Sequence, residues 1–233
     1  MQEFLEDKEA GFVGRIVDGD TAIINGNSTR FLGINTPEKG ERYYQEAKDF
    51  LGGLILNKTV TLEYGAEKTD LYGRKLAFIF LDGKNINIEQ VRNGFANVYV
   101  LDYKKYESEL REAWEECIAD GRNLCERSTN ECSYCIELKD LDIENQEVIL
   151  SNKCDFGCSL NNWTIKDEGR KKFTFRNFVL ETNKEARIIV GNGTDSADVL
   201  YWKDETYVWT ATGDTLFLRD SEGKLVLWKE IRK

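Results

Sequence analysis

The chain has 233 residues, of which 41% are apolar and one is proline, a composition typical of one large or two small globular domains. The sequence contains no histidine, which excludes histidine-based nucleases, zinc hydrolases with imidazole ligands, and Ser-His or Cys-His triads. The net charge of −10 argues against a broad electrostatic surface for nucleic acid. Any hydrolytic chemistry must therefore use carboxylates, arginines, tyrosines or a metal ion bound by oxygen.

The first half of the chain is predicted to form short strands followed by helices. Apolar alternation and turn residues predict strands over residues 12–17, 22–25, 29–34, 58–64 and 76–81, with a tight hairpin at Asp18-Gly19-Asp20. Helical spacing of apolar residues predicts helices over 43–56, 86–93 and 103–120, the last two ended by Gly94 and Gly121.

The second half is predicted to be a β-sandwich of immunoglobulin type. Seven short strands separated by turn residues are expected over residues 147–151, 163–167, 172–176, 186–190, 199–202, 215–219 and 225–229. We place the boundary near residue 129, which gives an α+β protein with domains over 10–128 and 129–233.

Four short motifs carry the polar residues of the first half. Each has an ordinary interpretation by itself, since Asp-Gly is the commonest hairpin signal and Thr-Pro-Glu is a plausible turn. The motifs are Val-Asp-Gly-Asp-Thr at 17–21, Arg-Phe-Leu-Gly-Ile at 30–34, Asn-Thr-Pro-Glu at 35–38 and Thr-Asp-Leu-Tyr-Gly-Arg at 69–74. Their order and spacing resemble the staphylococcal nuclease (thermonuclease) family from about Val13 to Leu124.

This resemblance implies an OB-like five-stranded β-barrel with three helices, and a calcium-dependent nuclease. Members of the family cut DNA or RNA to leave a 3′-phosphate and a 5′-hydroxyl. By the same resemblance, Arg30 and Arg74 clamp the scissile phosphate and Glu38 acts as general base. Tyr72 would stack on the nucleotide or donate a hydrogen bond to it.

The resemblance also implies a calcium site made of oxygen ligands. Asp20, the side chain of Asn35 and the backbone carbonyl of Thr36 would hold the ion, with Asp18 acting through water. Asn35 stands where many members have aspartate, which removes one negative charge and predicts weaker calcium binding.

A second departure is Leu71, which replaces a basic residue often found before the tyrosine and removes a phosphate contact. With the acidic net charge, these departures support an alternative function. In that alternative, the domain is an inactive nuclease fold that binds nucleic acid or protein.

The second half resembles the lamin tail domain family across about residues 135–231. The resemblance rests on residues 161–168, 172–180 and 213–220, and it implies an immunoglobulin-like fold with an attachment or recognition role. A surface, polymer or protein partner is therefore expected for this domain, in a protein that is otherwise a monomer. Four tryptophans are interpreted as core residues or as an aromatic binding face: Trp163, Trp202, Trp209 and Trp228.

The six cysteines have two interpretations with different consequences for location. Cys132, Cys135, Cys154 and Cys158 have spacing close to that of a four-cysteine zinc site. Disulfides are the alternative, and the even total fits three bridges, with Cys117 and Cys125 flanking a helix end. Disulfides favour an extracellular or cell-surface protein whose signal peptide is absent from this sequence, whereas zinc would allow a cytoplasmic one.

Overall fold

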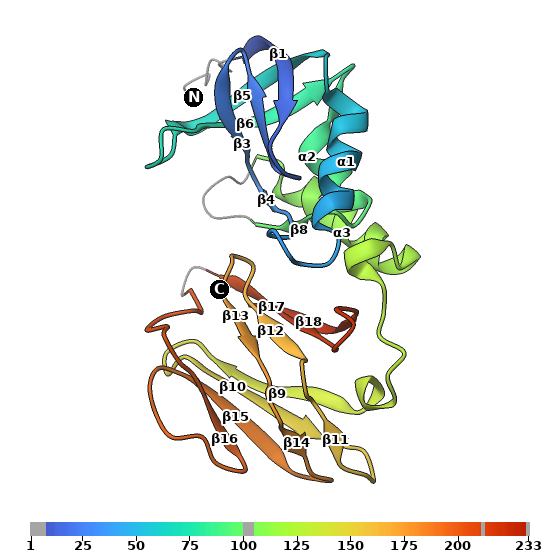
Figure 1. The fold of residues 1–233 in the computed structure, drawn as a ribbon, viewed down its shortest axis with the longest axis vertical. Helices are drawn as coiled ribbons and strands as arrows, with labels where there is room; N and C mark the ends of the chain where they lie inside the picture. The colour runs from blue at the N-terminus through green and yellow to red at the C-terminus, as the bar shows by residue number, and fades with distance from the viewer. Residues whose placement is uncertain (1–7, 100–104, 211–212, 232–233) are drawn as a thin grey trace. The chain divides into compact units, whose positions relative to one another are not determined.

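The computed structural model describes residues 8–99, 105–210 and 213–231. The chain divides into two compact units, Met1–Cys125 and Glu126–Lys233, and each is described by itself (Figure 1). Among the described residues, no helix has the length and apolar character needed to cross a bilayer.

The first unit is built on a β-barrel. Its sheet has the strand order β3-β2-β1-β5-β6-β7, and a further parallel pairing of β3 with β6 closes the five longer strands (Figure 1). The strands are β1 (Lys8–Ile16), β2 (Thr21–Ile24), β3 (Asn27–Phe31), β5 (Thr59–Thr69), β6 (Lys75–Leu81) and the short β7 (Lys84–Asn85). Apolar side chains alternate toward the barrel core, including the fully buried Val13, Ala22, Leu62 and Ile79. The predicted five-stranded barrel is confirmed.

Three helices accompany the barrel, as predicted: α1 (Tyr44–Ile55), α2 (Ile86–Arg92) and α3 (Glu107–Asp120). The side chain of Asn85 caps α2 by accepting hydrogen bonds from the backbone N–H groups of Asn87 and Ile88. Gly121 ends α3 in the left-handed conformation. Residues 103 and 104 of the predicted third helix lie outside the described residues. A short 3₁₀ helix, η1 (Asn123–Cys125), follows.

The strand predicted over residues 29–34 is wrong in one respect, because the chain breaks it into two. β3 ends at Phe31, and a separate β4 (Ile34–Asn35) pairs with β8 (Asn97–Val98). Gly33 lies between them with φ +75°, and a Cβ there would lie 2.7 Å from a side-chain atom of Leu110. Glycine therefore allows the turn that takes Asn35 away from the line of β3.

The second unit is a β-sandwich, which confirms that prediction. One sheet has the order β16-β15-β10-β9 and the other β13-β12-β17-β18, and both contribute to one apolar core. Their strands are β9 (Ile136–Asp142), β10 (Glu147–Asn152), β12 (Thr164–Lys166), β13 (Lys172–Thr174), β15 (Glu185–Val190), β16 (Val199–Trp202), β17 (Asp214–Arg219) and β18 (Leu225–Ile231). A two-stranded ladder joins β11 (Cys158–Ser159) to β14 (Val179–Leu180), and η2 (Glu131–Tyr134) precedes β9.

The tryptophans of the second unit mainly fill its core. Trp163, Trp202 and Trp209 are buried, as the core interpretation predicts. Trp228 is half-buried, and the guanidinium of Arg127 lies 5.0 Å from its ring centre.

All six cysteines are paired in disulfides, which agrees with the second interpretation of their spacing. Cys117–Cys125 joins the end of α3 to η1 in the first unit. The second unit contains Cys132–Cys158 and Cys135–Cys154.

Candidate active site

Asp20 is the centre of a buried polar cluster in the first unit. It lies between the turn that follows β1 and the start of β2, and its side chain is almost fully buried. Its Oδ2 accepts hydrogen bonds from the backbone N–H and the Oγ1 of Thr36, both at 2.9 Å. Its Oδ1 accepts one from the Thr21 hydroxyl at 3.0 Å. Asp20 therefore connects the hairpin turn to the segment after β4.

Arg30 on β3 reaches into the same cluster and is only 7% exposed. Its Nε lies 3.3 Å from Asp20 Oδ1. Its Nη1 donates to the Phe31 carbonyl at 2.6 Å, and its Nη2 donates to the Ile34 carbonyl at 2.6 Å and to Asn35 Oδ1. The guanidinium is thus surrounded by oxygen atoms from three segments, so it both organises the cluster and balances its charge.

Asp18 adds a second carboxylate next to Asp20. Its Oδ1 accepts a hydrogen bond from the Asp20 backbone N–H at 3.1 Å. Burial, together with repulsion from the charge of Asp20, raises the pKa of Asp18 to about 6. A divalent cation would relieve this repulsion.

The donor set of the cluster fits calcium. The side chains of Asp18, Asp20 and Asn35 and the carbonyl of Thr36 offer oxygen, which hard cations prefer. The structure therefore brings together Arg30 and the four residues predicted for the ion.

The other predicted residues lie on exposed segments near the ends of strands. Glu38 is exposed in the loop before α1, where its backbone N–H donates to Glu41 Oε2 at 3.0 Å. Tyr72 is 86% exposed in the turn between β5 and β6. Both side chains are open to solvent and accessible to a ligand.

Arg74 is held by its own hairpin. Its Nε donates to Asp70 Oδ2 at 2.7 Å, and its guanidinium lies 5.7 Å from the centre of the Tyr72 ring. The parallel pairing of β3 with β6 sets Arg30 opposite Leu76. Arg74 precedes Leu76 by two residues. Its backbone therefore lies about 7 Å from the Arg30–Leu76 pair, toward the N-terminal end of β6. Among the described residues, the side chain of Arg74 contacts Asp70 and Tyr72 and none of the residues around Arg30, so the structure does not join the two arginines.

Two buried residues near the cluster were missed by the sequence reasoning. Gln90 on α2 is fully buried, and its Nε2 donates to the carbonyl of Gly19 and, at 3.3 Å, to that of Ala47. Asn97 on β8 is directly opposite Asn35, and its Oδ1 is buried without a hydrogen-bond partner among the described residues. Directly opposed residues of an antiparallel pair share a face of the sheet, so Asn97 points to the same side as Asn35.

Comparison with known proteins connects this geometry to a known family. A family model described as staphylococcal nuclease homologue matches residues 28–127. The chain is 31% identical over 130 residues to the thermonuclease of Staphylococcus intermedius, an alignment that covers 51% of this chain and 77% of that protein.

Two further relatives are similar over slightly less than half of the chain. The thermonuclease of Staphylococcus hyicus is 32% identical over 122 residues, covering 47% of this chain and 72% of that protein. Endonuclease YhcR of Bacillus subtilis (strain 168) is 29% identical over 133 residues, covering 46% of this chain and 11% of that protein. The family model ends at residue 127, so the resemblance of the second unit to lamin tail domains stays a prediction.

Proposed function

The chain belongs to the staphylococcal nuclease family, and on that basis we propose that its first unit is an active, calcium-dependent nuclease that cuts DNA or RNA. The observation that supports this proposal most is the buried cluster of Arg30 with the oxygen atoms of Asp20 and Asn35. Burying a charge this deeply is costly unless it is paired, so such a cluster is expected where function requires it.

The chain's own side chains supply binding and proton transfer in this proposal. Arg74 and Arg30 bind the phosphate oxygens, and their fixed charge stabilises the negative charge that develops as the phosphorus is attacked. Glu38 accepts a proton from the attacking water, whose oxygen bonds to phosphorus as the bond to the 5′ oxygen breaks. The 5′ oxygen takes a proton from a solvent water molecule as it leaves, which gives a 5′-hydroxyl and a 3′-phosphate, and Glu38 returns the proton that it accepted to solvent.

Asp20, Asn35 and the Thr36 carbonyl would hold calcium, with Asp18 contributing through water. A bound calcium ion would neutralise phosphate charge and draw a polyanion to a protein whose net charge is −10. Tyr72, exposed beside Arg74, would stack on a base or donate a hydrogen bond to the nucleotide.

A second candidate function is an inactive nuclease fold that only binds nucleic acid or protein. It is favoured by Asn35, which lowers the charge of the calcium site, and by Leu71, which is fully exposed where a basic residue would contact phosphate. Binding of nucleic acid without cleavage in saturating calcium would support this candidate.

We also propose that the two domains have different functions. The domain over residues 10–128 is the nuclease, and the domain over 129–233 attaches the protein to a partner. The disulfides favour an exported protein. From the resemblance of the second domain alone, we expect that it binds a surface, polymer or protein, and we expect the protein to be a monomer. Co-sedimentation of the full chain with cell-envelope preparations tests this part, and failure to sediment would contradict it.

The enzymatic proposal is tested with end-labelled single-stranded DNA and RNA of the same sequence, in calcium and in EDTA. We expect calcium-dependent cutting to products that carry a 3′-phosphate. Arg74→Ala should lower the rate by about 10²–10⁴-fold, because one transition-state contact is lost.

Arg15→Ala is the matched control, since Arg15 is exposed on β1, and its rate should stay within about twofold of the parent. Equal loss in both variants, or an Arg74→Ala variant as fast as the parent, would show that the site is assigned wrongly.

A further inference from the structure

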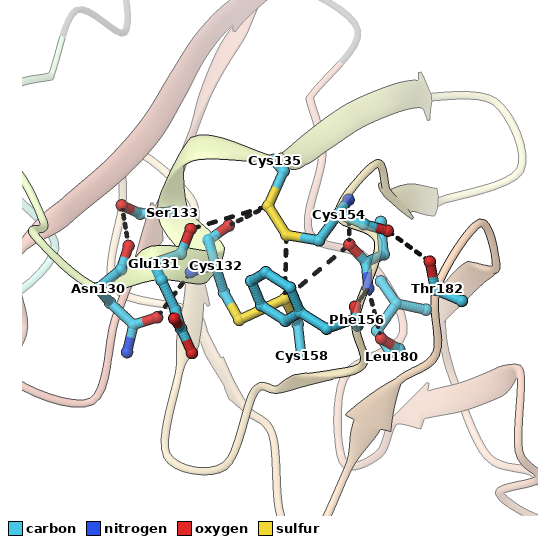
Figure 2. Close-up of a disulfide and its surroundings, with 11 residues drawn as sticks. Asn130, Glu131, Cys132, Ser133, Cys135, Cys154, Phe156, Cys158, Leu180 and Thr182 are labelled. Atoms are coloured by element: carbon cyan, nitrogen blue, oxygen red, sulfur yellow. Dashed lines mark hydrogen bonds between the residues drawn. A yellow bond between two sulfur atoms is a disulfide. The ribbon is translucent and has the colours of Figure 1, made fainter.

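Two disulfides of the second unit lie in contact with each other (Figure 2). One joins Cys132 of η2 to Cys158, the first residue of β11, and the other joins Cys135, directly after η2, to Cys154 in the loop between β10 and β11. The Sγ atoms of Cys154 and Cys158, which belong to different disulfides, are 3.5 Å apart. The sulfurs of Cys135, Cys154 and Cys158 all lie within 4.8 Å of one another, and Cys132 is bonded to Cys158. Three of the four sulfurs therefore form one compact group, and the fourth is bonded to a member of it.

Residues 130–135, which contain η2, are held in place by hydrogen bonds of the backbone and of the Asn130 side chain. Asn130 caps η2, with its Oδ1 accepting from the Cys132 N–H at 3.0 Å. The Cys135 N–H donates to the Cys132 carbonyl at 3.2 Å, and the Lys153 N–H donates to the Cys135 carbonyl at 2.8 Å. None of these bonds uses sulfur, so they do not depend on the oxidation state of the cysteines.

The segment that carries Cys154 and Cys158 is organised by the fully buried side chain of Asn152. Its Nδ2 donates to the carbonyls of Phe156 and Leu180, both at 2.8 Å, and its Oδ1 accepts from the Cys154 N–H at 2.8 Å. The two segments that carry the four cysteines, residues 130–135 and 152–158, are therefore held in place by interactions other than the disulfides.

The arrangement is close to what a tetrahedral metal site requires. A zinc–thiolate bond is about 2.3 Å, so the sulfurs of a tetrahedral four-thiolate site lie about 3.8 Å apart. Cys154 and Cys158 are already near that separation. Opening a disulfide would move its sulfurs from about 2 Å to about 3.8 Å apart, which side-chain rotation can supply.

We propose that the reduced chain binds one zinc ion through Cys132, Cys135, Cys154 and Cys158. The same four residues then cross-link the second unit in two ways. They form two disulfides under oxidising conditions and a zinc tetrathiolate under reducing ones. A dithiol reductant gives two electrons and two protons to each disulfide and becomes a cyclic disulfide itself. Zinc binding to the four thiols then releases four protons.

The donor chemistry selects zinc among the common ions. Four soft sulfur donors in a compact, mostly buried cluster favour zinc over calcium or magnesium, which prefer oxygen. This site lies in the second unit and does not rest on the proposed nuclease function.

The test uses the full chain with Cys117→Ser and Cys125→Ser, which removes the unrelated disulfide of the first unit. The protein is reduced with a phosphine without oxygen and titrated with cobalt, which reports thiolate ligands by its charge-transfer and visible bands. We expect one cobalt per chain with the spectrum of four thiolates, and its displacement by one equivalent of zinc. The oxidised protein should show no thiolate charge-transfer band with cobalt.

A further Cys154→Ser substitution should weaken zinc binding by more than about 100-fold, because a direct ligand is lost. If this variant does not fold, the cobalt spectrum of the double-serine protein still decides the question. No cobalt bound to the reduced protein, or a spectrum without thiolate charge transfer, would overturn the proposal.

Discussion

Both units bury carboxylates, but they satisfy them in different ways. In the second unit, Asp214 is buried and accepts hydrogen bonds from the backbone N–H groups of Glu168, Thr215 and Thr210 at 2.8–3.2 Å. In the first unit, Asp20 is bound by the side chains of Arg30, Thr36 and Thr21 as well as by one backbone group.

This difference distinguishes a carboxylate held by backbone groups alone from one held also by charged and hydroxyl side chains. Asp220 combines the two patterns, because its side chain accepts from the backbone N–H groups of Glu222 and Lys224 and from the hydroxyl of Ser128. A carboxylate that faces an arginine and the oxygens of other segments forms a charged cluster, and such clusters are enriched at functional sites. Buried polar residues are therefore informative about function only when their partners are known.

The largest expected effect is that of Arg30→Ala on the first unit. Removing one member of a buried pair leaves Asp20 without its counter-charge, which should cost about 3–5 kcal/mol of stability. Hydrogen exchange of the core amides of β2 and β6 measures this loss, and Arg15→Ala serves as the exposed control. An Arg30→Ala variant as protected as the parent would mean that the cluster does not stabilise the barrel.

The second prediction concerns pH and the second unit. Burial, followed by repulsion from Asp214, raises the pKa of Asp167 to about 7 from 3.8. The folded unit therefore holds a proton that the unfolded chain releases. The stability that the raised pKa of Asp167 contributes to the folded unit is complete below about pH 4 and is lost as the pH rises to about 7.

Asp167→Asn should remove this dependence. Between pH 4 and pH 7.5, the free energy of unfolding of the parent should fall by about 2–4 kcal/mol more than that of the variant. Urea unfolding, followed through the fluorescence of the buried tryptophans of the second unit, measures this difference. Parallel stability curves for the two proteins would contradict the assignment. Exposed Asp155→Asn is the control.

Gln90→Leu tests whether α2 positions the turn at Asp18-Gly19-Asp20, where we propose that calcium binds. The substitution keeps an apolar helix face but leaves the Gly19 carbonyl without its side-chain donor, which should cost about 1–3 kcal/mol. Because Gly19 lies between Asp18 and Asp20, calcium affinity should fall as well. Calorimetric titration of calcium checks this, and unchanged affinity in a destabilised variant would restrict Gln90 to packing.

The smallest effect is expected for Asn35→Asp, which restores a negative charge to the cluster. Calcium should bind on the order of tenfold more tightly, a gain of about 1.4 kcal/mol. Asn27→Asp, exposed on β3, adds the same charge at a distance and should leave the affinity unchanged. Equal gains in both variants would indicate a general electrostatic effect and not a ligand effect.

The sequence predicted most elements of both units because their apolar residues alternate or recur at helical spacing. It missed β9, where charged residues such as Glu137, Lys139 and Asp140 hide the alternation of an edge strand. It also joined β3 and β4, since the turn at Gly33 depends on the close approach of Leu110 from a distant helix.

The candidate site was predictable only in part. Short motifs and their resemblance to a family pointed to Arg30, Asp20 and Asn35, which the fold brings together. Gln90 and Asn97 could not be found in this way, because their relevance depends on which carbonyl or strand lies opposite them in space.

The most direct test of the central claim is the single-turnover rate of single-stranded DNA cleavage as a function of free calcium. We predict a rate that rises to saturation with calcium, falls to background in EDTA, and saturates at lower calcium in Asn35→Asp. Cleavage that persists in EDTA, or a complete absence of cleavage at saturating calcium with DNA bound, would contradict the proposed function.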